Sequence, residues 1–346
     1  MILFLSIFPY GKECADGASQ RIIQIDRILE NENKIYFGLS LHKYLLPKIK
    51  ISKNRTEFRA NIMWSFLLIP YLLLSKYIYL HSIFSVFRCR ILFKIFATNK
   101  IILDIHGIVP EELEYCGEIN KSRKFTQIEK LVISKSICLI GVTQKMLDYM
   151  VSKYNSKHIK VILLPMLTYD IELLKKDTDC PNDRQYDIIY AGGVQKWQNL
   201  DILANIVNSL PELKYALFVS HPEKISELFQ KKWLLRNVTH DVVINTLKQS
   251  SLGFICRDNH ILNVVSCPTK LIEYIVFGVV PVVQNKHLGD FYDLGYEFFC
   301  CDDILENGFP EQSLIKEKQE RNFIVLSKLK QVIFDGEIKL RQYVGC

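Results

Sequence analysis

The segment at residues 266–283, SCPTKLIEYIVFGVVPVV, holds residue types that can bind a phosphate group. A Pro-Thr-Lys turn opens a predicted helix there, and a glycine ends that helix before a buried strand. The first N–H groups of a helix lack an intrahelical partner and carry the positive end of its dipole, so we expect those of Thr269, Lys270 and Leu271 to bind an anion. The Lys270 ammonium adds a positive charge, and the Glu273 carboxylate can accept hydrogen bonds from a ribose diol. The segment therefore predicts a nucleotide diphosphate site.

The same segment resembles the nucleotide-sugar segment of the glycosyltransferase group 1 family, in its bacterial surface-polysaccharide form. These are retaining enzymes with the two-domain GT-B fold. The family pattern places Glu-Ala-x-x-x-Gly before a Pro-Val-Val strand, and Glu273, Gly278 and Pro281 stand at those positions here. The resemblance implies that Glu273 binds the donor ribose and that Pro268, with the loop that follows it to Leu271, binds the donor phosphates. The alternative is an amphipathic core helix with an ordinary cap.

A second segment, YAGGVQKWQNLDIL at residues 190–203, looks like the first strand and glycine turn of the family's donor domain. Glycine lets the backbone approach a phosphate or sugar closely, so Gly192 and Gly193 are candidate donor-binding residues. Lys196 lies in the same turn and is a further candidate. A Gly-Gly turn alone is weak support, because many strand-to-helix turns contain glycine.

The chain departs from the family pattern at charged positions. Many members carry an Arg just after the turn glycine and a Lys three residues before the helix Asp; with Asp201 as that Asp, these positions hold Gly193 and Gln198. The family also has an earlier glutamate, eight positions before Glu273, where this chain has Val265. The cation that stabilises a leaving diphosphate must therefore come from elsewhere, unless these changes indicate lost activity.

Arg257 and Lys270 are the favoured cations. Arg257 follows the apolar run LGFIC, so we expect it to emerge at the carboxyl end of a buried strand. A cation in that place can stabilise the charge that develops on a diphosphate. The alternative for Arg257 is a salt bridge with Asp258 or another surface acid, and Lys196 is more readily explained as a solvated side chain.

The first half of the chain offers candidate acceptor-side residues. The run IILDIHG predicts a strand that ends in Asp104 and His106. The resemblance implies that His106 lines the sugar site, in a catalytic role, whereas Asp104 can simply orient a loop. Gly17 stands where the family has a glycine-rich loop, and Thr143 follows another strand. Helix capping, by Asp16 or Ser19 before the first helix and by Thr143 itself, explains these two positions equally well.

Short apolar runs alternate with helical patterns in both halves of the chain, which predicts parallel sheets built from strand-helix-strand units. Strands are expected near 2–8, 34–39, 77–81, 100–105, 137–142, 159–164, 186–191, 214–220, 239–243, 252–256, 279–284 and 297–300. Helices are expected near 18–31, 61–75, 83–97, 110–116, 124–135, 144–154, 199–209, 223–234, 244–250, 268–277, 288–294 and 314–334.

The length of 346 residues favours two domains. A polar stretch rich in turn formers predicts a linker at 169–185, between an acceptor-binding domain at 1–168 and a nucleotide-sugar-binding domain at 186–346 that includes a C-terminal helix. The fold class is therefore α/β: a GT-B arrangement of two Rossmann-like, doubly wound parallel-sheet domains. Such domains are expected to face a common cleft at the carboxyl ends of their strands.

Composition excludes disordered and low-complexity classes, with 49% hydrophobic and 23% charged residues. The ten cysteines contain no CxxC pair, and the eight histidines form no HExxH, so we expect a reduced protein without a metal or another cofactor. The N-terminal run MILFLSIFPYGKE predicts a buried strand instead of a signal peptide, and residues 62–80 are interrupted by Pro70 and Lys76. A cytoplasmic protein is expected.

The net charge of +7 is unevenly distributed. Residues 1–168 hold 24 Lys+Arg against 13 Asp+Glu, whereas residues 169–346 hold 20 against 24. Within the basic half, residues 82–100 interleave phenylalanines with Arg and Lys, which predicts peripheral contact with an anionic membrane or, alternatively, a buried helix. No recognition motif accompanies the charge, so nucleic acid is a poorer partner.

Together these features predict a retaining, metal-independent glycosyltransferase of polysaccharide biosynthesis, of the lipopolysaccharide or capsule kind. It would transfer a sugar from a nucleotide diphosphate donor, a UDP-sugar, to a hydroxyl of a lipid-linked oligosaccharide or another surface glycan. Two alternatives stay open: a nucleotide-sugar epimerase of the same fold, and a non-catalytic relative that serves as a binding or scaffold protein.

Overall fold

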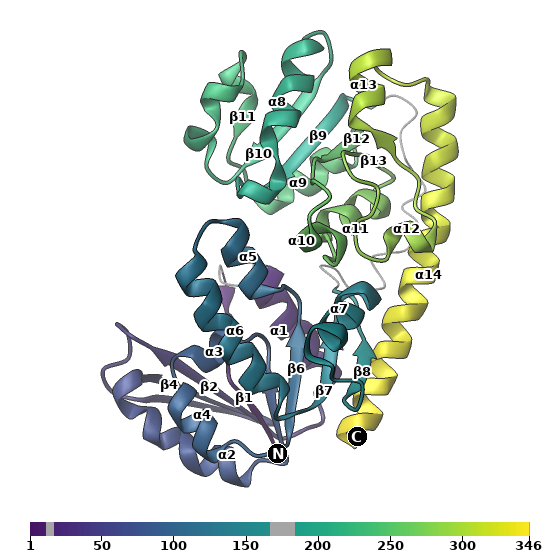
Figure 1. Cartoon of the computed structure of the whole chain (residues 1–346). Helices are drawn as coiled ribbons and strands as arrows, with labels where there is room; N and C mark the ends of the chain where they lie inside the picture. The colour runs from purple at the N-terminus through teal and green to yellow at the C-terminus, as the bar shows by residue number, and fades with distance from the viewer. Residues whose placement is uncertain (12–16, 167–183, 346) are drawn as a thin grey trace. The chain divides into compact units, whose positions relative to one another are not determined.

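A computed structural model describes residues 1–11, 17–166 and 184–345 of the chain (Figure 1). The chain divides into two compact units, one formed by Met1–Met166 with Val332–Cys346 and the other by Leu167–Gln331. Asp16 and most of the predicted linker at 169–185 lie outside the described residues.

Unit 1 is built on an eight-stranded sheet in the order β3-β4-β2-β1-β5-β6-β7-β8. All neighbouring strands are parallel except β3, which pairs antiparallel with β4. The strands are β1 (Ile2–Phe4), β2 (Lys34–Ser40), β3 (Lys48–Ser52), β4 (Arg55–Asn61), β5 (Tyr77–Leu80), β6 (Ile101–Ile105), β7 (Ser136–Gly141) and β8 (Lys160–Leu163). The helices are α1 (Gly17–Ile28), η2 (Ile62–Leu68), α2 (Ile69–Leu74), α3 (Phe84–Phe87), α4 (Arg90–Phe96), α5 (Val109–Tyr115), α6 (Ile119–Ile133) and α7 (Gln144–Tyr154).

Unit 2 is built on a six-stranded, fully parallel sheet in the order β11-β10-β9-β12-β13-β14. The strands are β9 (Tyr186–Gly192), β10 (Tyr215–Val219), β11 (Leu235–Arg236), β12 (Ser250–Ile255), β13 (Val280–Val283) and β14 (Phe299–Cys300). The helices are η4 (Lys196–Gln198), α8 (Leu200–Ser209), η5 (Pro222–Lys224), η6 (Ser226–Leu228), η7 (Lys232–Leu234), α9 (His240–Leu247), α10 (Ile261–Val264), α11 (Thr269–Val276), α12 (Phe291–Leu294), α13 (Cys301–Asn307) and α14 (Gln312–Val344).

Both sheets have the doubly wound order. In unit 2 the chain builds outward from β9 to β10 and β11, and then returns to place β12 on the other side of β9. In unit 1 the same reversal places β5 beside β1. Ligands of such sheets bind at this switch point, beyond the carboxyl ends of the two adjoining strands. The predicted class, two doubly wound parallel-sheet domains, is confirmed.

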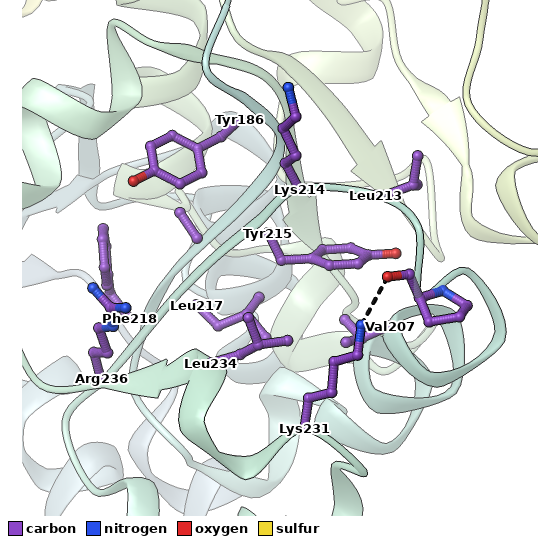
Figure 2. A pocket seen from close by; sticks show the side chains of 12 residues that line it. Tyr186, Val207, Leu213, Lys214, Tyr215, Leu217, Phe218, Lys231, Leu234 and Arg236 are labelled. Atoms are coloured by element: carbon purple, nitrogen blue, oxygen red, sulfur yellow. Dashed lines mark hydrogen bonds between the residues drawn. The ribbon is translucent and has the colours of Figure 1, made fainter.

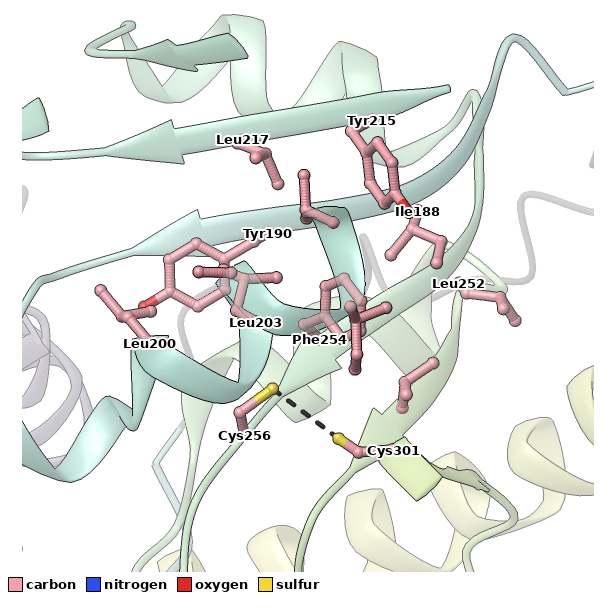
Figure 3. Packing of buried hydrophobic residues seen from close by; sticks show 14 of the residues in the cluster. Ile188, Tyr190, Leu200, Leu203, Tyr215, Leu217, Leu252, Phe254, Cys256 and Cys301 are labelled. Carbon is pink, nitrogen blue, oxygen red and sulfur yellow. Dashed lines mark hydrogen bonds between the residues drawn. The ribbon is translucent and has the colours of Figure 1, made fainter. Parts of the chain in front are cut away.

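The core of unit 2 packs the apolar side chains of β9, β10 and β12 against α8 (Figure 3). Ile188 and Tyr190 lie on one face of β9, and Leu203 of α8 covers them. At the edge of this cluster the sulfur atoms of Cys256 and Cys301 lie 3.8 Å apart. All cysteines in the described part of the chain are free thiols.

The helix α14 corrects the predicted domain boundary, because its last turns belong to unit 1. The Arg341 Nε group donates to the Ile28 carbonyl at 3.2 Å, and the Lys76 ammonium donates to the Val344 carbonyl at 2.9 Å. The prediction assigned all of 186–346 to the second domain and ended the helix near 334. An amphipathic period cannot say which core a helix face covers, so this assignment was beyond the sequence pattern.

Two predicted elements were wrong, and several short elements were not predicted. The predicted strand at 239–243 is the start of helix α9, and the helix expected at 223–234 is a series of single 3-10 turns before the edge strand β11. The β3–β4 hairpin was not predicted. A short run of β-branched residues such as Val-Val-Ile fits a strand or one face of a helix, and only packing decides between them.

Candidate functional site

The candidate site of unit 2 lies at its switch point. Gly192 is the last residue of β9, and Arg257 follows the neighbouring strand β12. Helix α11 begins soon afterwards at Thr269. The order of the sheet therefore places three segments far apart in sequence, the glycine turn, the end of β12 and the α11 region, on the switch-point side of the sheet.

Lys270 brings its ammonium to the glycine turn. Its Nζ atom lies so close to Gly192 that a methyl group at that residue would overlap it. The ammonium donates to Gln198 Oε1 at 3.1 Å and lies 4.2 Å from the centre of the Tyr190 ring. Burial, reinforced by the nearby positive charge of Arg257, lowers the pKa of Lys270 to about 7. Glycine at 192 is therefore what leaves room for this cation.

This contact changes the meaning of one departure from the family pattern. The position where a family lysine is expected holds Gln198, and the Gln198 amide oxygen accepts a hydrogen bond from Lys270. Gln198 is buried, and Gly193 uses its carbonyl to accept from the Tyr190 hydroxyl at 2.7 Å. A positive charge is thus present at the turn, but it arrives from α11.

Arg257 is half-buried and shares the same region. Its Nη1 group donates to Ser266 Oγ at 3.0 Å, and Ser266 in turn donates to the Asn263 carbonyl at 2.9 Å. Its buried Nε atom has no hydrogen-bond partner among the described residues, and burial lowers the pKa of the guanidinium. The Asp258 carboxylate, the alternative partner of Arg257, accepts from the Asn263 amide at 2.6 Å.

Glu273 is half-buried on α11, one turn after Thr269. Burial raises the pKa of its carboxyl to about 7, although the Lys270 charge opposes that shift. Within the described part of the chain the Glu273 side chain forms no hydrogen bond or ion pair, so it is available to a ligand. Val265, where the family has a second glutamate, is buried and apolar.

The first turn of α11 matches the predicted anion site at two of its three N–H groups. The Leu271 N–H is not free as predicted, because it donates to the Pro268 carbonyl at 3.0 Å. Among the described residues nothing accepts from the N–H groups of Thr269 and Lys270. Lys196, in contrast, is exposed on η4.

The candidate residues of unit 1 include a buried charge cluster. Asp104 is fully buried and forms a two-pronged ion pair with the fully buried Arg21, at 2.9 Å for each contact. The Tyr79 hydroxyl donates to the same carboxylate at 3.0 Å, and His81 Nδ1 lies 3.6 Å from it. Burial alone would raise the pKa of Asp104, but Arg21 holds it well below its usual range. Asp104 has no surface to offer an acceptor, so its place is structural.

His106 directly follows β6 and is half-buried, at the predicted strand end. Its Nε2 atom is buried and has no hydrogen-bond partner among the described residues. Burial lowers the pKa of the imidazole, so His106 is neutral at pH 7. A neutral ring with an unused nitrogen can donate to or accept from a sugar hydroxyl.

The other two acceptor-side candidates lie at helix starts. Thr143 is buried and caps α7, where its hydroxyl accepts from the Met146 N–H at 3.1 Å; the capping alternative is correct for this residue. Gly17 is exposed at the first residue of α1. A methyl group there would lie 2.9 Å from Met166 Cε, so Gly17 marks a close approach of two segments.

One further cavity of unit 2 lies away from the candidate site. A cavity of about 320 Å³ lies beside β10 and is lined by Tyr215, Leu217 and Leu234 (Figure 2). It contains none of the donor-site candidates and reaches the starting ends of the strands, so it is separate from the switch point. The described residues hold no group of three His, Cys, Asp or Glu side chains that could bind a metal ion. They also hold no helix long and apolar enough to cross a membrane.

Solved structures give a match along the whole chain. No protein-family model matches the sequence, and no protein of curated function matches it. A sucrose-phosphate synthase from Thermosynechococcus elongatus is 12% identical, with a TM-score of 0.69. The match covers 99% of this chain and 98% of that one. A trehalose-6-phosphate structure from E. coli, bound with UDP-2-fluoro glucose, has the same identity and TM-score, with coverage of 100% and 99%. This chain has the GT-B fold.

A third similar structure is the UDP-forming α,α-trehalose-phosphate synthase from Burkholderia xenovorans in complex with glucose-6-phosphate. It is 12% identical, with a TM-score of 0.62, and each chain covers 100% of the other. At this identity the similarity concerns the GT-B fold alone.

Proposed function

We propose that the chain is a retaining glycosyltransferase that uses a nucleotide diphosphate sugar, with a UDP-sugar as the donor class. The observation that carries the proposal is the delivery of the Lys270 ammonium to the turn at Gly192, on the helix that also presents Glu273. A cation, two available N–H groups and a carboxylate are thereby grouped at the switch point of a doubly wound sheet. These are the groups that a nucleotide diphosphate requires.

Each residue has a distinct role in this proposal. The donor diphosphate lies between the Gly192-Gly193 turn and the N-terminus of α11, where Lys270 and Arg257 face its negative charge. The Glu273 carboxylate accepts hydrogen bonds from the ribose hydroxyls. Exposed Lys196 contributes only at the rim. The cations act most strongly when the bond to the diphosphate breaks, because charge then develops on the leaving phosphate.

The bond changes follow from this arrangement. The bond between the sugar anomeric carbon and the phosphate oxygen breaks, and its electron pair leaves with the nucleoside diphosphate. The acceptor hydroxyl oxygen forms the new bond, and its proton passes to a phosphate oxygen of the leaving group. Retention of configuration is supported by a structural neighbour, a trehalose-6-phosphate synthase studied for glycosyl transfer with retention. His106 in unit 1 would bind a sugar hydroxyl.

The acceptor has two candidate classes. A similar synthase was solved with glucose-6-phosphate, which supports a sugar phosphate as the first candidate. The lipid-linked or surface-glycan acceptor predicted from the sequence is the second, because unit 1 exposes apolar side chains on a basic surface. The proposed location of the enzyme is the cytoplasm, as the sequence predicts.

The two alternative functions are less well supported. An epimerase typically needs several carboxylates around the sugar, and the donor-site candidates that the structure describes include one carboxylate, Glu273. A non-catalytic binding protein was suggested by Gly193, Gln198 and Val265, which stand where the family has charged residues. The contact between Gln198 and Lys270 answers the first two, because another element supplies the positive charge, whereas Val265 leaves the site without the family's second glutamate.

Calorimetry with UDP tests the donor site. We expect UDP to bind and Glu273→Ala to weaken it about 10- to 100-fold, since hydrogen bonds to a charged group contribute about 1.5–3 kcal/mol. Lys316→Ala is the matched control, because Lys316 is exposed on α14. Absence of binding to any nucleoside diphosphate, or unchanged binding by Glu273→Ala, overturns the assignment. Nucleotide release that depends on an added acceptor then separates transfer from epimerisation.

A further inference from the structure

Unit 1 carries an unusually apolar exposed surface around one end of its sheet. Seven apolar side chains from five segments are each between 65% and 78% exposed: Leu45, Leu46, Ile51, Met63, Leu74, Ile91 and Ile95. We call these seven residues and their surroundings the amphipathic surface. Single exposed apolar residues are ordinary, but so many on neighbouring elements indicate an interaction site.

The segments that carry these residues are linked by contacts within unit 1. The Trp64 Nε1 group of η2 donates to the Leu45 carbonyl at 2.8 Å, which joins the loop before β3 to η2. Helix α2 continues η2 and packs against α4 (Figure 1). Tyr71 of α2 lies on Phe58 of β4, with ring centres 5.2 Å apart. The residues are therefore parts of one region of unit 1.

Register places the isoleucines of β3 beside this region. Ile49 pairs with Phe58 across the antiparallel ladder, so both side chains point to the same face of the sheet. Ile51 is two residues further along and shares that face. Tyr71 covers Phe58, but β3 is the outermost strand, and both isoleucines stay exposed.

The charge of this region is almost all of one sign. Residues 41–100 contain 11 Lys and Arg against a single acidic residue, Glu57. Glu57 is buried, and both Arg55 and Arg59 pair with it. Exposed lysines flank the apolar residues, with Lys48 in β3 and Lys94 between Ile91 and Ile95 in α4. An occupant of this surface must therefore be both apolar and anionic.

We propose that the amphipathic surface docks on the interface of an anionic lipid bilayer. Aliphatic side chains would enter the boundary between head groups and acyl chains, while lysine and arginine meet the phosphates. An acidic protein is a poorer fit for so many aliphatic side chains, and nucleic acid offers nothing apolar. The proposal does not depend on the glycosyltransferase assignment.

The amphipathic surface differs from the segment 82–100 that the sequence predicted for membrane contact. Phe93 is fully buried. The rings of Phe84 and Phe87 contact Phe125 of α6, the first edge-on at 4.8 Å and the second stacked at 5.3 Å between ring centres. The phenylalanines therefore contribute to packing more than the prediction assumed. Within that segment the isoleucines of α4 are more exposed than Phe84 and Phe87.

Vesicle co-flotation tests the proposal with the full-length chain. We expect binding to vesicles of phosphatidylcholine with phosphatidylglycerol, little binding to phosphatidylcholine alone, and a fall at high salt. The triple variant Lys43→Gln/Lys48→Gln/Lys53→Gln should reduce binding by about 100-fold, since each basic side chain near an anionic surface contributes about fivefold. Ile91→Gln/Ile95→Gln should reduce binding by about 10- to 100-fold. The matched control is Ile324→Gln/Phe334→Gln, because both residues are exposed on α14.

Other outcomes overturn the proposal. Equal loss in the control variant, or binding that does not depend on anionic lipid, contradicts it. Self-association that Ile91→Gln/Ile95→Gln abolishes, measured by sedimentation, assigns the surface to a second copy of the chain instead. Binding to a single-stranded oligonucleotide with the same charge dependence assigns it to nucleic acid. The UDP affinity of the same variants, measured by calorimetry, should be unchanged. A failure of the membrane proposal is therefore distinguishable from a failure of the donor-site proposal.

Discussion

Donor binding above neutral pH should take up a proton, and Lys270 should be its destination. In the free chain, burial and the neighbouring Arg257 lower the pKa of Lys270 to about 7. A bound diphosphate places negative charge beside the ammonium and favours its protonated form. The two effects oppose each other, so binding shifts the pKa of Lys270 upward.

The number of protons taken up follows from the pKa of Lys270 in the free chain and its pKa with the donor bound. At pH 8 a group of pKa about 7 is roughly one-tenth protonated, so a donor that restores an ordinary lysine pKa takes up about 0.9 proton. The affinity for the donor should weaken about tenfold between pH 6 and pH 8, because the protonated fraction of Lys270 falls about tenfold over that range. Glu273 also titrates near pH 7, since burial raises its pKa to about 7, and Glu273→Gln removes that contribution.

Calorimetry with a UDP-sugar at pH 8, in two buffers of different ionisation enthalpy, measures the proton uptake. A UDP-sugar is preferable to UDP because its diphosphate keeps a constant charge over this range. We expect uptake in the wild type and in Glu273→Gln, and none in Lys270→Met or Lys270→Arg. Lys270→Met should also lower kcat about 10²- to 10³-fold, as for the loss of one preorganised charge contact. Absence of uptake in the wild type, or the same uptake in Lys270→Met, would show that Lys270 does not take up the proton.

Three further predictions concern single residues. Gly192→Ala should displace the flexible end of Lys270 and weaken UDP-sugar binding while the melting temperature changes little; unchanged binding would show that the ammonium is not needed at the turn. Asp104→Asn should lower the free energy of unfolding at pH 7 by about 3–5 kcal/mol in a denaturant titration, because Arg21 is left buried without its counter-ion. The pKa of Asp104 is depressed by folding, so this stabilisation should be lost below about pH 4, and a constant difference down to pH 2 would contradict the ion pair. Thr143→Ala should cost about 1 kcal/mol through the lost helix cap and leave UDP binding unchanged; weakened UDP binding would contradict a purely structural role.

The sheet architecture could be predicted because strand and helix periods differ and alternate clearly. Buried runs such as CLIG in β7 and GFIC at the end of β12 lack polar residues, as central parallel strands do. Edge elements gave no such signal. β3 reads as alternating lysine and isoleucine with both faces exposed, and β11 is only two residues long, so neither stands out from a loop.

The candidate donor-site residues on α11 stand out from local spacing, whereas their long-range contacts do not. A cap, a lysine and a glutamate at fixed offsets define one helix start, and this is visible in the sequence. Nothing in the spacing says that the Lys270 side chain reaches Gly192 and Gln198, some 70 residues earlier. The sequence did contain one signal. The family's lysine position holds Gln198, and Lys270 lies at the start of a helix near the same edge of the sheet.

The charge cluster of unit 1 was also hidden. Arg21 reads as an ordinary helix residue, 83 positions before its partner Asp104. The prediction put Asp104 near the acceptor because strand ends face ligands in such sheets. A carboxylate near the end of a strand can equally well point into the protein when a buried arginine pairs with it.

A crystal structure of the chain with UDP is the most direct test of the donor site. We expect phosphate oxygens within hydrogen-bond distance of the Lys270 ammonium and of the Thr269 and Lys270 N–H groups, and the ribose hydroxyls on the Glu273 carboxylate. UDP bound away from the Gly192 turn, or with its diphosphate out of reach of Lys270, would contradict the proposed donor site.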